Sequence, residues 1–352
     1  MSGATLIDVL PAHKFDEAKL ANYLQDYLPG ANQGIKVQQF QGGQSNPTYL
    51  LTTGTGDRLA RYVLRKKPPG KLLPSAHMVE REFQVINALG KTDVPVPTAR
   101  LLCEDPEIIG TAFYVMDYVE GRVYSQPLLS EVAQEERMPI YQSMIETMAK
   151  MHNADWKAIG LEGYGKPDNY IARQVKRWGG QFEASRTHDM PAMDALMKWL
   201  PENIPADEST TIAHGDFRIG NLMLHPTESK VVSILDWELA TLGHPLSDLA
   251  YCCLPYHMPV NVDGAKGMVG ADLKSLGLPE EQQLLDWYCE YTGRSGVPNW
   301  NYYIAFSLFR LAAIVQGVYH RALQGNASNA DALEVGKRAS LLAERGWEIA
   351  QK

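Results

Sequence analysis

Three oxygen-bearing side chains near the middle of the sequence have a spacing that suits phosphoryl transfer. The run HGDFRIGN, residues 214–221, contains Asp216 and Asn221, and the apolar stretch VVSIL is followed directly by Asp236. Phosphoryl transfer needs a carboxylate at the acceptor hydroxyl and oxygen ligands for Mg²⁺ bridging the phosphates. One loop can supply the carboxylate and an amide ligand, and the end of a following strand can supply a charged ligand. The competing interpretation is a turn-rich loop whose Asp and Asn only cap the backbone.

The composition is that of a globular protein. The 352 residues include 33 basic and 41 acidic side chains, a net charge of -8, with 45% hydrophobic and 21% charged residues. These values exclude disordered and fibrous classes, and the length suggests about two domains or lobes. The acidic balance argues against a nucleic-acid partner. Four cysteines without a CxxC pattern predict neither a disulfide framework nor a zinc site, and fit a reducing, cytoplasmic location.

The sequence gives no sign of a membrane partner. Its start, MSGATLIDVLPAHK, has neither a basic beginning nor a long apolar core, so we expect no secretory signal. The most apolar late stretch, residues 303–319, is interrupted by Arg310 and Gln316. It is therefore predicted to be a packed helix rather than a membrane span.

The elements that must position these side chains divide the chain into two parts. Residues 35–66, 100–105 and 111–119 predict strands, and residues 75–90 predict a helix with Ser75 as N-cap and Gly90 as stop. Residues 1–118 should therefore form a nucleotide-binding lobe with a small antiparallel sheet and one helix. Residues 119–352 should form a larger, mostly helical catalytic and acceptor-binding lobe, with helices at 170–186 and through much of 280–350. The fold class is α+β.

Long phrases along nearly the whole chain carry a family resemblance. They are GGQSNPTYLL, YVLRKKPPGKLLPSAHMVEREF, YIARQVKRW, HGDFRIGNLML, ILDWELATLGHPLSDLAY and FSLFRLAAIVQGVYHRALQGN. The chain resembles the aminoglycoside/choline-kinase-type phosphotransferases, which share the two-lobed fold of protein kinases. Its likeness is greatest to the phosphotransferase domain that some proteins join to an acyl-CoA dehydrogenase. The resemblance implies ATP and Mg²⁺ as cosubstrates, a functional link to an acyl-CoA dehydrogenase, and a hydroxyacyl-CoA or similar hydroxy acid derivative as acceptor.

The resemblance also implies roles for the loop residues. Asp216 corresponds to the catalytic carboxylate that orients the acceptor hydroxyl. Asn221 and Asp236 correspond to the Mg²⁺ ligands, whether for one ion or two. Arg218 stands where protein kinases have a lysine near the transferred phosphate, and a solvated surface charge is the equal alternative. His214 and Asp248 are expected to brace the loop.

Two stretches of the first lobe are expected to contact the nucleotide. The turn between the first two strands contains Gly42, Gly43, Ser45 and Asn46. Glycines there let backbone N–H groups approach phosphates, although an ordinary hairpin turn is the alternative. Residues 116–121 resemble a kinase hinge, in which adenine would bond to the carbonyl of Asp117 and the N–H of Val119.

The third strand departs from the kinase pattern. Arg65 stands where lysine is usual, and arginine can bind phosphate in a bidentate way. Lys67 shares its strand face and is the second candidate. Glu82 lies on the apolar stripe of the predicted helix and needs a partner, for which Arg65 is the natural choice. Glu80 is the alternative partner of Arg65.

Basic side chains indicate the charge of the acceptor. Arg173, Lys176 and Arg177 share one helical face, and if they border the cleft they favour an anionic acceptor such as a CoA ester. Arg310 and Arg321, on the late helix, are lesser candidates for the same anion. We therefore expect an ATP- and Mg²⁺-dependent small-molecule kinase for a hydroxyacyl-CoA or hydroxy acid. The alternatives are an aminoglycoside, choline or sugar-amine kinase, and a nucleotide-binding pseudokinase.

Overall fold

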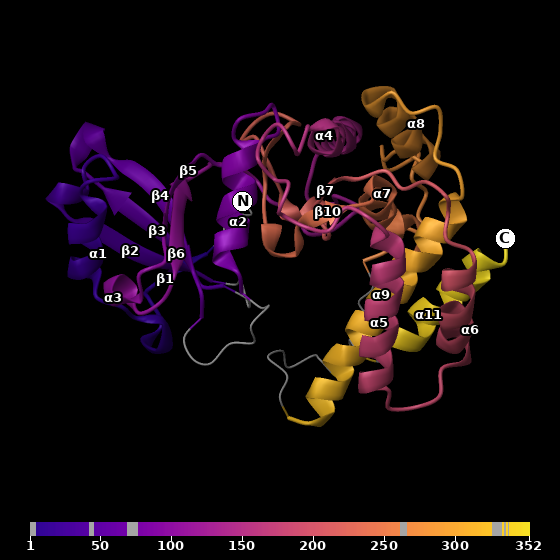
Figure 1. Cartoon of the computed structure of the whole chain (residues 1–352). Coiled ribbons are helices and arrows are strands. Elements are labelled where there is room, and N and C mark those ends of the chain that lie inside the picture. The colour runs from indigo at the N-terminus through magenta and orange to yellow at the C-terminus, as the bar shows by residue number, and fades with distance from the viewer. Residues whose placement is uncertain are drawn as a thin grey trace. The chain divides into compact units, whose positions relative to one another are not determined.

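The computed structural model describes residues 5–41, 46–68, 77–260, 266–325 and 338–352, together with Leu333 and Gly336. The chain divides into two compact units (Figure 1). The first comprises residues 1–123, 157–161 and 222–240, and the second comprises residues 124–156, 162–221 and 241–352. The predicted boundary after residue 118 lies near the end of the first continuous stretch, and the first unit also takes in a later segment that contains Asp236.

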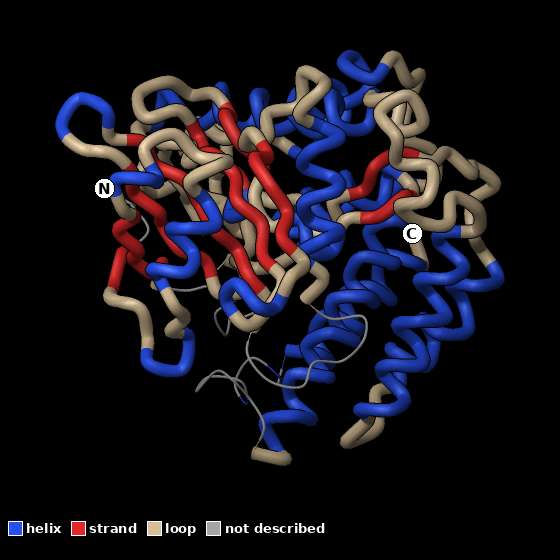
Figure 2. The backbone as a smooth tube through the Cα atoms, turned by 60° about the vertical axis from the view of Figure 1, so that its left-hand side comes forward, coloured by secondary structure: helices blue, strands red, loops and turns tan. Residues whose placement is uncertain are grey.

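The first unit is built on a six-stranded antiparallel sheet, drawn in red in Figure 2. Its strands are β1 (Leu6–Ile7), β2 (Ile35–Phe40), β3 (Thr48–Thr53), β4 (Ala60–Lys66), β5 (Ala99–Cys103) and β6 (Phe113–Asp117). They lie in the order β1-β2-β3-β4-β6-β5. A separate antiparallel pair, β8 (Leu222–Leu224) and β9 (Val231–Ile234), leads to Asp236. The predicted antiparallel sheet is confirmed.

The two faces of the sheet have different coverings. Alternate residues such as Tyr62 and Leu64 join an apolar core with α1 (Glu17–Leu24) and α3 (Pro106–Ile109). Because successive strand residues point to opposite faces, Arg65 points away from this core. Helix α2 (Val79–Leu89) packs on β5 and β6. The sequence predicted α2 but neither α1 nor α3.

Helix α2 places an acid on its buried side. Of the predicted apolar stripe, Val79, Ile86 and Leu89 are buried and Phe83 is partly buried. Glu82 lies among them and is only 1% exposed. The helix ends at Gly90, the predicted stop. The helix begins at Val79 with Met78 at its N-cap, so the predicted N-cap at Ser75 is wrong; Ser75 itself lies outside the described residues. A carboxylate in this apolar position requires a cationic or hydrogen-bonding partner.

The second unit is mostly helical. Its helices are α4 (Gln134–Asn153), α5 (Tyr170–Ser185), α6 (Pro191–Glu202), α7 (Pro245–Cys253), α8 (Glu281–Thr292), α9 (Trp300–Leu323) and α11 (Arg338–Ala350). A two-stranded antiparallel ladder joins β7 (Thr211–Ala213) to β10 (Thr241–Gly243). Strand β7 therefore ends directly before the loop that carries Asp216. The predicted helices at 170–186 and through much of 280–350 are confirmed.

Helix α9 is a core helix of the second unit. By length and composition it could cross a membrane, but 72% of its most apolar window is buried inside the structure. It packs against α5, α7 and α11. Arg310 is buried on this helix.

Candidate active site

The loop after β7 is held by a buried carboxylate. Asp248, in the first turn of α7, accepts the backbone N–H groups of His214 at 2.5 Å and Gly215 at 2.9 Å. Gly215 has φ +82°, a conformation that glycine adopts without strain. Burial alone would raise the pKa of Asp248, but His152 and the loop N–H groups outweigh it and hold the pKa below its usual range. The expected bracing role of Asp248 is confirmed.

The backbone of this loop is fixed from two further directions. The imidazole Nδ1 of His214 accepts the N–H of Asp216 at 3.2 Å, which agrees with the expected structural role of His214. From α9, the guanidinium of Arg310 donates to the carbonyl of Gly215. The same guanidinium lies 5.2 Å from the ring centre of Tyr251. Arg310 was a lesser candidate for the acceptor anion, and its observed contacts are instead to the loop and to Tyr251.

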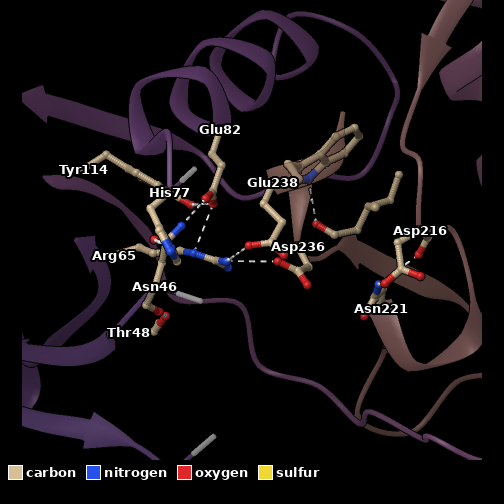
Figure 3. Close-up of polar contacts among 12 residues, drawn as sticks. Asn46, Thr48, Arg65, His77, Glu82, Tyr114, Asp216, Asn221, Asp236 and Glu238 are labelled. Carbon is tan, nitrogen blue, oxygen red and sulfur yellow. Dashed lines mark hydrogen bonds and ion pairs between the residues drawn. The ribbon is translucent and has the colours of Figure 1, made fainter. Parts of the chain in front are cut away.

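The carboxylate of Asp216 is oriented by its neighbours. The side-chain amide of Asn221 donates to its Oδ2 at 2.7 Å and to its backbone oxygen at 2.8 Å, and Figure 3 shows the two side chains together. Arg218 Nε lies 3.3 Å from the same Oδ2. Tyr251 lies near Asp216; burial, reinforced by this acid, raises the pKa of Tyr251. The carboxylate remains 20% exposed, so a hydroxyl can reach it.

A second cluster lies in the first unit, around Arg65. Its guanidinium contacts Glu82 at 3.1 Å and Asp236 at 2.9 Å, with Glu238 at 3.8 Å (Figure 3). Glu82 was the predicted partner. Lys67, the second candidate on this strand, pairs with Glu80 instead. Of the two basic residues that the sequence left as alternatives, Arg65 is therefore the one that pairs with Glu82.

The charges in this cluster depend on one another. Burial raises the pKa of Glu82 to about 7, although Arg65 and the hydroxyl of Tyr114 lower it in part. Burial also disfavours the charged form of Arg65, but Glu82 and Asp236 outweigh this effect and raise the pKa of Arg65. Arg65 and Glu82 thus each stabilise the charged form of the other in a site that has little contact with water.

Asn46 connects the glycine-rich turn to this cluster. Its side chain is 1% exposed and donates to Glu82 Oε1 at 2.7 Å, while its own oxygen faces His77 Nδ1 at 3.1 Å. The amide nitrogen of Asn46 is therefore bonded to Glu82, and its amide oxygen contacts His77. The other residues predicted for this turn, Gly42, Gly43 and Ser45, lie outside the described residues.

Asp236 has an unusual backbone conformation. Its φ and ψ are 65° and 64°, a left-handed region that few non-glycine residues adopt and that is enriched at functional sites. The indole of the next residue, Trp237, anchors the turn by donating to the carbonyl of Ile234 at 3.1 Å. The side chain of Asp236 is 37% exposed, and Arg65 contacts its Oδ1 at 2.9 Å. A carboxylate with this exposure can also bind a cation.

The donor atoms suit Mg²⁺. The amide nitrogen of Asn221 is engaged by Asp216, so the side-chain oxygen is the atom that Asn221 offers. This amide oxygen and the carboxylate of Asp236 in the first unit are each hard oxygen donors, the kind that Mg²⁺ prefers.

The predicted hinge lies at the end of β6. The carboxylate of Asp117 binds the guanidinium of Arg100 at 2.6 and 2.7 Å. Tyr118 donates its N–H to the carbonyl of Arg61 at 3.2 Å, and Val119 follows without belonging to a strand. Any adenine contact at Asp117 would therefore use its backbone.

The predicted acceptor cations on α5 lie apart from the cavity near Asp216. Arg173 donates to the carbonyl of Lys166 at 2.5 Å, Arg177 lies 5.3 Å from the ring centre of Trp178, and Lys176 is exposed. A cavity of about 120 Å³ is lined instead by Arg218, Tyr251 and Lys266, with apolar neighbours. Because Arg218 and Tyr251 both contact Asp216, this cavity adjoins the carboxylate.

Tyr251 and Lys266 are residues of this site that sequence reasoning missed. Tyr251 lies one helical turn after Asp248 on α7, a spacing that could have indicated a shared face. Lys266 belongs to no motif, and nothing in the local sequence indicates its position.

Comparisons with known proteins agree with this geometry. The model of the phosphotransferase enzyme family matches residues 36–284. A crystal structure from Ralstonia eutropha, which carries the provisional name of an aminoglycoside phosphotransferase, is 44% identical, with a TM-score of 0.87 and coverage of 96% of this chain and 99% of that one. Choline kinase from Cryptosporidium parvum is 13% identical, with a TM-score of 0.65 and coverage of 96% and 97%. The predicted kinase-like fold is confirmed.

Two curated relatives are much longer than this chain. Acyl-CoA dehydrogenase family member 10 from Mus musculus is 45% identical over 334 residues, which are 95% of this chain and 31% of the relative. Acyl-CoA dehydrogenase family member 11 from Homo sapiens is 41% identical over 353 residues, which are 99% of this chain and 44% of the relative. The chain thus spans less than half the length of these relatives.

Proposed function

Because the chain belongs to the phosphotransferase enzyme family, we propose that it transfers the γ-phosphoryl group of ATP to a hydroxyl of a small anionic metabolite. The observation that carries this proposal is Asp216, a partly exposed carboxylate oriented by Asn221 and adjoining a cavity with basic side chains. The acceptor we favour is a hydroxyacyl-CoA or a free hydroxy acid.

Asp216 acts on the acceptor hydroxyl. It accepts a hydrogen bond from the acceptor hydroxyl and takes its proton as the hydroxyl oxygen bonds to the γ-phosphorus and the bond to the ADP oxygen breaks. The contacts from Asn221 and Arg218 hold the carboxylate in one orientation. Arg218, beside Asp216, places a positive charge near the transferred group.

Residues of the first unit are proposed to bind the nucleotide. Arg65, held by its ion pair with Glu82, contributes positive charge toward the phosphates. The turn containing Gly42, Gly43, Ser45 and Asn46 is proposed to approach the phosphates, and the backbone of Asp117 and Val119 to bind adenine. Asn221 and Asp236 are the proposed Mg²⁺ ligands. Mg²⁺, when bound, neutralises charge on the phosphates.

Charge supports an anionic acceptor over a cationic one. Arg218 and Lys266 line the cavity beside Asp216, and none of its lining residues in the described part of the chain is acidic. A polycationic aminoglycoside or choline would favour carboxylates there. Arg173, Lys176 and Arg177 remain proposed contacts for a more distant part of the anion.

The names of the long relatives support a CoA ester in particular. Both are named as members of the acyl-CoA dehydrogenase family. We propose a functional link in which the phosphorylated product passes to an enzyme that acts on acyl-CoA thioesters. The link predicts that a purified acyl-CoA dehydrogenase consumes the CoA product only after the kinase reaction, and equal consumption of the unphosphorylated thioester would contradict it.

The test of the phosphotransferase is a screen for ADP formation. Hydroxyacyl-CoAs, free hydroxy acids, choline and aminoglycosides are each supplied with ATP and Mg²⁺. We expect turnover with the first two groups and a loss of about 10²–10⁴-fold in Asp216→Asn. Asp189→Asn, an exposed aspartate of the second unit, is the matched control. Turnover preference for choline or aminoglycosides would overturn the acceptor, and nucleotide binding without turnover of any acceptor would favour a pseudokinase.

A further inference from the structure

A second, larger cavity lies in the second unit beside the one at Asp216. Its volume is about 420 Å³, and it is formed by the loop after α7 and by helices α9 and α11, which pack along each other. Its aliphatic lining includes Leu311 and Val315 from α9 and Leu341 and Leu342 from α11. A cavity of this size and lining can hold an apolar chain.

The two cavities are neighbours. Met258, Lys266 and Leu311 line both of them. The smaller cavity also includes Arg218 and Tyr251, which contact the carboxylate of Asp216. A molecule whose hydroxyl lies at Asp216 can therefore extend past Lys266 and Leu311 toward the aliphatic residues of the larger cavity.

Positive charge accompanies the apolar lining. Lys266, Arg338 and Arg345 line the larger cavity, and among its described lining residues none is acidic. Arg345 is engaged by Glu348 and by the carbonyl of His257. Lys266 makes a 3.3 Å contact to the carbonyl of Ser125, and the buried Nε of Arg338 has no hydrogen-bond partner among the described residues. Lys266 and Arg338 are thus the cations that a ligand can use.

We propose that this second cavity is the subsite for the remainder of the acceptor, an apolar chain that bears an anionic group. The chain packs on Leu311, Val315, Leu341 and Leu342, and the anion lies near Lys266 and Arg338. The inference rests on the proposed function, because it assumes that the acceptor hydroxyl lies at Asp216. A free carboxylate and the phosphates of CoA are the two sources of the anion, and the experiment separates them.

Steric variants test the apolar part. Val315→Phe fills the cavity from α9, and Leu341→Trp fills it from the partly exposed edge of α11, where disruption of folding is less of a risk. Leu323→Phe, at an exposed position on α9, is the matched control. Across hydroxyacyl acceptors of increasing chain length, both cavity variants should lower the long-to-short ratio of kcat/KM by at least about 10-fold. An unchanged ratio in both variants would overturn the proposal.

Charge variants test the anionic part. Lys266→Met and Arg338→Met keep the apolar stem but remove the charge, so KM for anionic acceptors should rise about 10-fold relative to neutral alcohols of the same chain length. A rise confined to CoA thioesters assigns the anion to the CoA phosphates, and a rise for free hydroxy acids assigns it to a carboxylate. An equal effect on neutral and anionic acceptors would refute the role of the cations.

A binding measurement separates this inference from the proposed function. The probe 8-anilinonaphthalene-1-sulfonate is an amphipathic anion, and its fluorescence should report binding to the nucleotide-free protein. We expect Val315→Phe and Lys266→Met each to weaken binding by at least about 5-fold, whereas Leu323→Phe should not. If these losses occur without any ATP turnover, the subsite stands and the kinase proposal fails. Binding that is unaffected by both variants would contradict the subsite.

Discussion

Arg65 is the residue on which the polar interior of the first unit depends. It contacts Glu82 and Asp236, and Glu82 is 1% exposed with further donors from Asn46 and Tyr114. Arginine can serve both acids at once because its planar guanidinium presents several donors in a fixed geometry. A lysine at this position would offer one compact ammonium. The departure from the usual kinase lysine is thus matched by the two acids around it.

Arg65→Met is predicted to destabilise the protein by roughly 3–5 kcal/mol at pH 8, because it leaves the carboxylate of Glu82 buried without its cation. Glu82→Gln in the same background should recover much of the loss, because a neutral amide needs no counterion. The measurement is a double-mutant cycle of urea unfolding. Additive effects of the two substitutions would contradict the pairing.

Helix α7 couples the catalytic loop to a buried histidine at its N-terminus. Asp248, in its first turn, holds the loop, and His244 caps the helix by accepting the N–H of Leu246 at 3.2 Å. The imidazole also stacks on Tyr303, with ring centres 5.0 Å apart. Burial lowers the pKa of His244 to about 4, although Asp207 raises it in part. The helix therefore begins at a histidine that stays neutral when folded.

This histidine predicts a pH dependence of stability. The unfolded chain binds a proton at His244 near pH 6.5, whereas the folded chain does so only near pH 4. The stability from the neutral imidazole is thus present above pH 6.5 and is lost as the pH falls toward 4, by up to about 1.4 kcal/mol per pH unit. His244→Asn retains a capping oxygen, so its unfolding free energy should vary less over this window. The measurement is urea unfolding of both proteins at several pH values. If the idea were wrong, the unfolding free energies of the unsubstituted protein and of His244→Asn would vary with pH to the same extent.

At the level of elements, the sequence predicted what local periodicity determines. The stripe of α2, the helix at 170–186 and the strand before Asp236 all follow from patterns within one segment. Tyr251 and Lys266 were missed because their place beside Asp216 is set by tertiary packing rather than by neighbouring residues. Arg173, Lys176 and Arg177 were correctly placed on one helix, but their shared face does not indicate which cavity they serve.

The whole chain has a kinase-like fold, and its two units contribute different chemistry. The first holds Arg65, Glu82 and Asp236, and the second holds the Asp216 loop and the two cavities that Lys266 lines. The relatives named as acyl-CoA dehydrogenases are more than twice as long as this chain, so their names bear on the proposed acceptor and not on the reaction of this chain.

Nucleotide binding should stabilise the whole chain. ATP with Mg²⁺ at 100 times its dissociation constant adds about 2.7 kcal/mol, which should raise Tm by roughly 3–4 °C. Asp236→Asn should lose the part of this increase that requires Mg²⁺, while Asp189→Asn should retain it. Thermal unfolding with ATP, with and without Mg²⁺, is the measurement, and a full Mg²⁺-dependent increase in Asp236→Asn would contradict the role of that carboxylate.

Mass spectrometry of the acceptor after incubation with ATP and Mg²⁺ tests the central claim most directly. We predict that the acceptor gains one phosphoryl group in an amount equal to the ADP formed, and that Asp216→Asn lowers both by at least about 100-fold. ADP formed without a phosphorylated acceptor, or an undiminished product in Asp216→Asn, would contradict it.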